Sequence, residues 1–170
     1  MLRSILFGLS ACLLVSCSSA AEEPQSPPHL ELTGRVVDAA ELLEPEFEAE
    51  LTQTLVRLET DTQVTLVVAT TPDLKGLPID QYSLELANAW GIGDAERNDG
   101  LVMLFAPNER KVRIEVGLGL EEVVTNEEAS LIIEEGMLPE LQNGNFEEGI
   151  RQGVFGLVRE VRLVHLKEAA

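Results

Sequence analysis

Residues 100–116 read Gly-Leu-Val-Met-Leu-Phe-Ala-Pro-Asn-Glu-Arg-Lys-Val-Arg-Ile-Glu-Val, and they predict a β-hairpin. The first strand, residues 101–106, is entirely apolar, as expected for a strand buried on both faces. In the second strand, residues 111–116, apolar and charged residues alternate, so only one face should be covered by the core. The turn is expected at residues 107–110, where a proline and an asparagine separate the two strands.

One register of this hairpin sets each apolar residue of the second strand opposite an apolar residue of the first, pairing Leu101 with Val116, Met103 with Ile114 and Phe105 with Val112. A slip by one residue would place core residues opposite Arg113 and Glu115, so the pattern specifies the register. Continued past the strands, this register brings Asn98-Asp99-Gly100 next to Gly117-Leu-Gly-Leu-Glu121. The two ends of the hairpin sequence are therefore expected to be neighbours.

Strand and helix patterns alternate along the rest of the chain. Further strands are expected at residues 34–38 and 63–71. Helices are expected to begin at Pro45, at Pro78, after Thr125-x-x-Glu128 and after Asn145-x-x-Glu148, with Gly136 interrupting the third. The order βαβαββαα requires parallel crossovers, with helices on both faces of the sheet. We predict a three-layer α/β/α sandwich over residues 32–167, with a mixed sheet of about four strands.

The N-terminal residues 1–16 have the pattern of an export signal. Arg3 is their only charged residue, and the apolar run from Ile5 is much shorter than the ~20 residues of a membrane-spanning helix. The segment ends in Leu14-Val-Ser-Cys17, which resembles the bacterial lipobox, so lipidation of Cys17 is expected. An ordinary signal peptide, in which Cys17 has no special role, is the alternative.

Residues 17–31 are small, polar and rich in proline, and they predict a flexible tether. We expect an exported protein of the bacterial cell envelope, held to a membrane by lipid at Cys17 and facing the periplasm. Ser18 after the cysteine resembles enterobacterial sorting to the outer membrane and slightly favours it. Cleavage before Cys17 would also remove Cys12 and leave no thiol for disulfides or catalysis.

The chain is strongly acidic, with 12 Lys and Arg against 30 Asp and Glu and a net charge of -18. Removal of the signal segment takes away Arg3, and the net charge becomes 11 - 30 = -19. Such a field repels nucleic acid and attracts cations and basic partners. Solubility of the surface is the simpler explanation for most of these carboxylates.

The predicted junction of the hairpin ends carries the candidate site. Gly100, Gly117 and Gly119 permit positive φ and close backbone approach, and side-chain oxygens of Asn98 and Asp99 lie beside them in sequence. Glu121 can fold back toward the junction. Asp38 ends the first strand, and its position relative to this junction depends on the strand order.

Several motifs, in this order, resemble those of the TPM-domain family: residues 34–38, Trp90-Gly-Ile-Gly93, Asn98-Asp99-Gly100 and residues 110–121. The resemblance covers residues 32–161. It implies the sandwich fold and an acidic groove that binds a divalent metal, often calcium. It also implies that Asp38, Asp99 and Glu121 are the metal-side acids and that Asn98, Arg113 and Glu115 line the groove. Family members commonly have a longer C-terminal part, with a transmembrane segment or a Gly-rich tail. This chain is instead expected to be anchored near its N-terminus.

Calcium, with magnesium or manganese as alternatives, suits scattered carboxylates better than zinc, which prefers His and Cys. His29 and His165 are interpreted as structural or solvent-exposed, and Trp90 as part of the core. A Ser-His-Asp hydrolase is disfavoured because no Gly-x-Ser-x-Gly is present. Gly117-Leu-Gly119 alone does not make a dinucleotide site. Arg113 and Glu115 could instead form a solvated surface pair.

Two functions follow from the resemblance. One is a metal-dependent phosphatase acting on phosphomonoesters, in which Arg113 would clamp the phosphate. The other is a membrane-anchored binding module that assists assembly or repair of envelope membrane protein complexes. The second is preferred, because calcium is a poor generator of nucleophilic water, no nucleophile is evident and the negative surface repels phosphorylated substrates.

Overall fold

The structure is a computed structural model that describes residues 30–168. The predicted signal peptide, Cys17, His29 and most of the predicted tether lie outside these residues. No helix within them combines the length and the apolar character that crossing a membrane requires.

The sheet has four strands, in the spatial order β1-β2-β3-β4: Val36–Asp38, Thr65–Thr70, Gly100–Ala106 and Lys111–Val116. The pairs β1·β2 and β2·β3 are parallel, and β3·β4 is antiparallel. All seven residues of β3 are buried, which fits its central place and its continuous apolar sequence. The predicted mixed sheet is confirmed, and β4 forms one of its two edges.

The predicted hairpin register is confirmed, with Leu101 opposite Val116, Met103 opposite Ile114 and Phe105 opposite Val112. Pro107 to Arg110 form the turn, which is closed by a 3.1 Å hydrogen bond from the Arg110 N–H to the Pro107 carbonyl. Arg110 takes a left-handed conformation, with φ at 54°. Just past the end of β4, the Gly117 N–H donates to the carbonyl of Gly100, the first residue of β3, at 2.8 Å.

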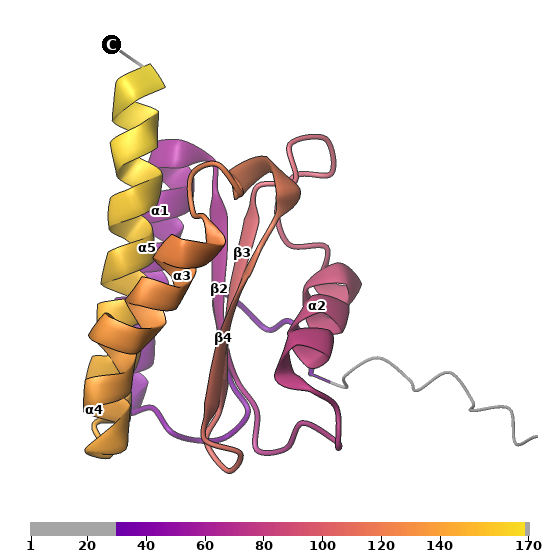
Figure 1. Ribbon diagram of the computed structural model, residues 1–170, viewed down its shortest axis with the longest axis vertical. Helices are drawn as coiled ribbons and strands as arrows, with labels where there is room; N and C mark the ends of the chain where they lie inside the picture. Colours follow the sequence, from indigo (N-terminus) through magenta and orange to yellow (C-terminus); the bar gives the residue numbers. More distant parts are fainter. Residues whose placement is uncertain (1–29, 169–170) are drawn as a thin grey trace, which may run out of the picture.

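Helices cover both faces of the sheet, as Figure 1 shows, which confirms the three-layer sandwich. On one side lie α1, α5 and the segment α3-η2-α4. On the other side lies α2, the only helix on that face among residues 30–168. A 3₁₀ turn, η1, follows β4. The bounds are α1 Pro45–Thr62, α2 Ile79–Trp90, η1 Leu118–Leu120, α3 Asn126–Leu131, η2 Ile132–Met137, α4 Leu138–Gln142 and α5 Phe146–Glu168.

Two apolar clusters hold the layers together. The larger one joins the sheet to α1 and α5 through residues such as Leu55, Leu66 and Leu157. The smaller one joins the sheet to α2 and includes Leu86, and Trp90 packs against it, as predicted for a core residue. The Trp90 indole N–H donates to the Leu30 carbonyl at 2.8 Å. His165 is exposed near the end of α5.

The third predicted helix begins as expected but is not interrupted at Gly136. Thr125 forms the capping box, with its Oγ1 accepting from the Glu128 N–H at 3.2 Å. The chain then stays helical to Gln142, passing through the π-helical turn η2. Met137 is fully buried there, and a Cβ added at Gly153 of α5 would lie 2.6 Å from its sulfur. Close packing of Met137 on Gly153 of α5 holds this segment helical. The chain around Gly136 therefore forms a wider π-helical turn and the helix does not break.

Candidate functional site

The two ends of the hairpin sequence, residues 98–100 and 117–119, lie side by side as predicted, and main-chain atoms make the contacts between them. The Gly119 N–H donates to the Asn98 carbonyl at 3.0 Å. A Cβ added at Gly119 would lie 1.8 Å from the Arg97 carbonyl oxygen, and one at Gly117 would lie 2.3 Å from the Asn98 oxygen. These glycines are needed for close approach and do not themselves take positive φ, whereas Asn98 does, at 51°. The junction is therefore closed by main-chain contacts.

Asp99 is buried at this junction, and both of its carboxylate oxygens already accept hydrogen bonds. Oδ1 accepts from the Asp94 N–H at 2.8 Å, and Oδ2 accepts from Arg97 Nε at 2.6 Å. This hydrogen bond raises the pKa of Arg97. Asp94 in turn accepts from the N–H groups of Arg97 and Glu96, which lowers the pKa of its carboxyl. Asp99 thus anchors the loop that precedes β3.

Asp38 lies at the opposite end of the sheet from Asp99, so the expectation that these acids share one site is not met. Asp38 pairs with Thr70, which pairs with Phe105. Because β1 and β3 run in the same direction, the residue that ends β1 and the residue that precedes β3 lie at opposite ends of the strands. Asp38 lies level with Phe105, which is six residues along β3 from Asp99. At ~3.3 Å per residue, Asp38 and Asp99 are about 20 Å apart along the strand direction. The Asp38 carboxylate accepts from the Leu43 N–H, at 2.8 Å, and from Thr70 Oγ1, which closes the turn after β1.

Three of the predicted residues do come together, in a groove that we call the upper groove. Arg113, Glu115 and Glu121 line this hollow of about 330 Å³ together with Ile114, Val116, Val124, Thr125, Asn126 and Glu127. Arg113 Nε lies 3.2 Å from Glu115 Oε2, which also accepts from Ser83 Oγ at 2.9 Å. Asp99 and Asn98 are not among its lining residues.

The walls of the upper groove include residues that sequence reasoning did not assign to a site. For Thr125, Asn126 and Glu127 the sequence predicts only the start of a helix. The capping box was the available signal, because it predicts where α3 begins. It does not indicate that this helix start faces the edge of β4.

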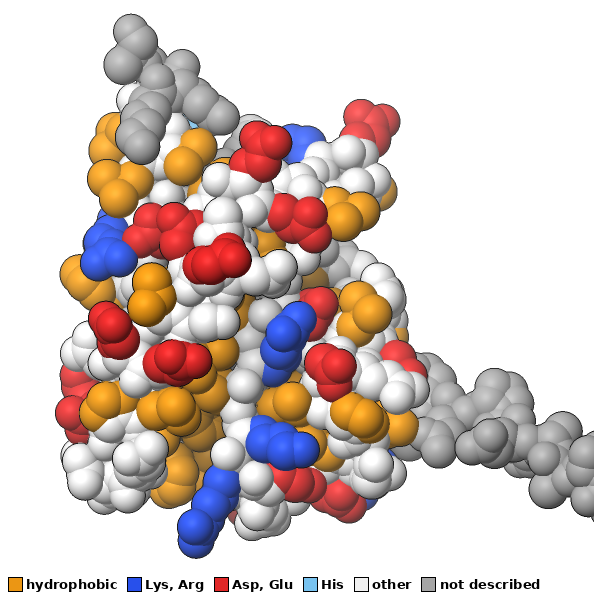
Figure 2. Space-filling view, viewed as in Figure 1, with side chains coloured by type: hydrophobic (Ala, Val, Ile, Leu, Met, Phe, Trp, Pro, Cys, Tyr) orange, Lys and Arg blue, Asp and Glu red, His pale blue; other side chains and the backbone are white. Residues whose placement is uncertain are grey.

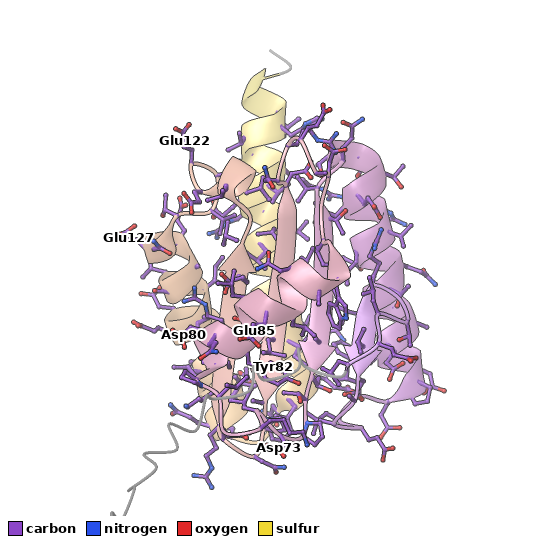
Figure 3. The ribbon with its side chains drawn as sticks, turned by 90° about the vertical axis from the view of Figure 1, so that its right-hand side faces the viewer. Asp73, Asp80, Tyr82, Glu85, Glu122 and Glu127 are labelled. Atoms are coloured by element: carbon purple, nitrogen blue, oxygen red, sulfur yellow. The ribbon has the colours of Figure 1, made fainter. Side chains whose placement is uncertain are left out.

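The predicted metal-side acids do not fit a single metal site. Calcium takes six to eight oxygen ligands, whereas Asp38 is remote and the oxygens of Asp99 are occupied by Asp94 and Arg97. Within residues 30–168, no three His, Cys, Asp or Glu side chains are grouped so that they could hold a metal ion. The acids labelled in Figure 3 are likewise spread over different elements, with Asp80 and Glu85 on α2 and Glu127 on α3.

A second hollow, the lower groove, lies at the other end of β4 and is larger, at about 500 Å³. Its lining is mostly apolar, and the rings of Phe105 and Phe146 meet edge to face there, with centroids 6.4 Å apart. The lining residues are Phe105, Pro107, Arg110, Lys111, Val112, Leu138, Leu141, Gln142, Gly144 and Phe146. Figure 2 shows a row of Lys and Arg side chains down the middle of this face, with hydrophobic atoms beside its lower part.

Comparison with known proteins agrees with this architecture. The family model described as TPM domain matches residues 36–160. The N-terminal domain of a protein from P. gingivalis is 32% identical, with a TM-score of 0.71, over 76% of this chain and 82% of that one. Among curated proteins, none matches the chain.

Two more distant structures support the fold alone. The N-terminal domain of a protein from Corynebacterium glutamicum is 16% identical, with a TM-score of 0.58, over 83% of this chain and 82% of its own. A protein from Bizionia argentinensis is 15% identical, with a TM-score of 0.63, over 71% of this chain and 82% of its own. The family match and the 32% identical structure together show that the chain belongs to the TPM domain family.

Proposed function

We propose that this chain is a membrane-anchored binding domain of the bacterial cell envelope, which holds a segment of a membrane protein complex during its assembly or repair. The observation that carries this proposal is the arrangement of Arg113, Glu115 and Glu121. They line an open groove, and both Arg113 and Glu115 are already paired. Paired, partly exposed charges around a hollow are suited to recognising another chain.

The sequence supports the anchor. Lipid at Cys17 would fix the chain to the membrane, because several acyl chains make such attachment effectively permanent. The predicted tether, residues 17–31, could reach at most about 54 Å at ~3.6 Å per residue. The domain could therefore meet the periplasmic parts of membrane proteins close to its own anchor.

The metal site implied by the family resemblance, with calcium as its first candidate, is not part of this proposal. Because Asp38, Asp99 and Glu121 do not form one ligand set, no step of the proposed function depends on an ion. The phosphatase alternative would need Arg113 to leave Glu115 and contact a phosphate, in a chain whose net charge of -18 repels that substrate. Hydrolysis of a phosphomonoester by the full chain, lost in Arg113→Ala, would favour this alternative.

Photocrosslinking in living cells tests the binding function. A photoreactive residue at Asn126, in the upper groove, is compared with one at Asn88, an exposed position on α2. We expect Asn126 to crosslink one or a few integral membrane proteins, Asn88 to give none of them, and Cys17→Ser to reduce the yield severalfold. Equal crosslinking from both positions, or crosslinks only to soluble proteins, would refute the proposal.

A further inference from the structure

Among residues 30–168, no strand pairs with the outer edge of β4. The Gly117 N–H bonds to the Gly100 carbonyl, so these two residues form a hydrogen-bonded pair, and such pairs alternate along an antiparallel ladder. It follows that Lys111, Arg113 and Glu115 direct their backbone groups toward β3, whereas Val112, Ile114 and Val116 direct theirs outward. In the described part of the chain, no strand lies beyond β4. None of the loop, turn and cap hydrogen bonds there uses the backbone of those three outward residues.

The two grooves follow this open edge from end to end. Lys111 and Val112 line the lower groove, and Arg113 to Val116 line the upper one. The opposite walls belong to the next helical segment, with Leu138 and Leu141 in the lower groove and Thr125 to Glu127 at the start of α3 in the upper. The edge of the sheet therefore borders a trough whose far wall is formed by the start of α3 at one end and by α4 at the other.

The charges along this trough are polarised. Three of the 12 basic residues of the chain, Arg110, Lys111 and Arg113, lie toward the hairpin turn. Glu115, Glu121 and Glu127 lie toward the other end. A strand added here would place each side chain next to the β4 residue opposite it, so the charges set which sequence fits.

We propose that an extended segment of the partner protein adds to the edge of β4 as a fifth, antiparallel strand. Its apolar residues lie opposite Val112, Ile114 and Val116, and the one opposite Val112 enters the lower groove. Acidic residues lie opposite Lys111 and Arg113, and a basic residue lies opposite Glu115. Read from its N-terminus, the segment has the pattern apolar, basic, apolar, acidic, large apolar, acidic. This inference rests on the proposed binding function and gives the chemistry of the bound segment.

A second copy of this chain fits the trough less well than a lone segment. The sequence of β4 could supply a similar charge pattern, with Arg113 of each copy opposite Glu115 of the other. A joined antiparallel sheet, however, has its two-fold axis perpendicular to the sheet, so both copies would place α3-η2-α4 over the same side of the joint. Because this segment walls the trough beside β4, the two would collide. A single strand needs only the width of the trough.

The test measures binding of a fluorescent peptide containing Val-Lys-Val-Glu-Phe-Glu to the full chain in detergent micelles by fluorescence anisotropy. Val116→Pro removes one outward N–H, and we expect it to weaken binding about three- to tenfold. Val36→Pro is the matched control. Val68 donates to the Arg35 carbonyl, so the backbone of Val36 faces outward at the other edge of the sheet.

A charge exchange keeps the test independent of folding defects. Arg113→Glu should weaken binding of this peptide about fivefold, and a peptide with Lys in place of its first Glu should bind that variant better than the wild type. No saturable binding, equal effects of the two proline variants, or no preference of Arg113→Glu for the exchanged peptide would overturn the inference. Self-association of the full chain that is lost in Val116→Pro would assign the edge to a second copy. Membrane-protein crosslinks at Asn126 alongside any of these results would leave the binding function standing and refute only strand addition.

Discussion

Substitution of Asp99 separates a structural role from a metal-binding role. In Asp99→Ala the Asp94 N–H and Arg97 lose their acceptor, which in the native chain lies at 2.8 and 2.6 Å. A hydrogen bond to a charged group contributes about 1.5–3 kcal/mol, and the half-exposed Arg97 adds less than 1 kcal/mol because of solvent screening. We expect a loss of about 2–3 kcal/mol. At about 4 °C per kcal/mol for a domain of this size, the thermal midpoint should fall by about 8–12 °C.

Urea unfolding followed by circular dichroism, in the presence of a chelator, measures this loss. Asp99→Asn keeps an acceptor for the Asp94 N–H and should lose about half as much. Asp61→Ala removes an exposed ion pair, with Asp61 Oδ2 2.8 Å from Arg162, and should change stability by less than about 0.5 kcal/mol. If Asp99→Ala were as stable as Asp61→Ala without metal, and had lost a calcium-dependent stabilisation of the wild type, our account of Asp99 would be wrong.

Three further predictions concern the same end of the sheet and its ligands. Gly119→Ala, whose Cβ would lie 1.8 Å from the Arg97 oxygen, should lose about 2 kcal/mol in urea unfolding. Gly34→Ala, whose nearest neighbour lies at 3.8 Å, should be close to neutral, and equal losses would contradict the close approach. The pKa of Asp94 is lowered below 3.8, first by the hydrogen bond from the Arg97 N–H, so its stabilising effect is present above pH 3.8 and disappears as the pH falls through the lowered pKa. Acid unfolding of Asp94→Asn should show a weaker pH dependence in that window, and an unchanged curve would argue against the loop bonds. Calcium titration should shift the thermal midpoint of the full chain no more than magnesium at equal ionic strength. A saturable, calcium-specific shift abolished in both Asp99→Ala and Glu121→Ala would restore the predicted metal site.

The hairpin illustrates what could be predicted. The alternation of Val112, Ile114 and Val116 with charged residues permits one register, and that register alone makes Gly100 and Gly117 neighbours. The capping box at Thr125 also predicted a helix start correctly. Gly136 did not end the helix, because burial of Met137 against Gly153 outweighed the low helix propensity of a single glycine.

The sequence by itself determined the layers, the strand pairing at the hairpin and the contact between its two ends, because side-chain periodicity and local turn and cap chemistry specify which face of each element is buried. Tertiary structure decided which charged groups meet. Because β1 and β3 run in the same direction, Asp38 lies far from Asp99. Arg97 donates a hydrogen bond to the carboxylate of Asp99. Packing of α3-η2-α4 on α5 creates the trough beside β4. The hydrophobic effect is non-directional and depends only on how much apolar surface is buried. Hydrophobic patterning therefore does not specify which charged side chains outside the core come into contact.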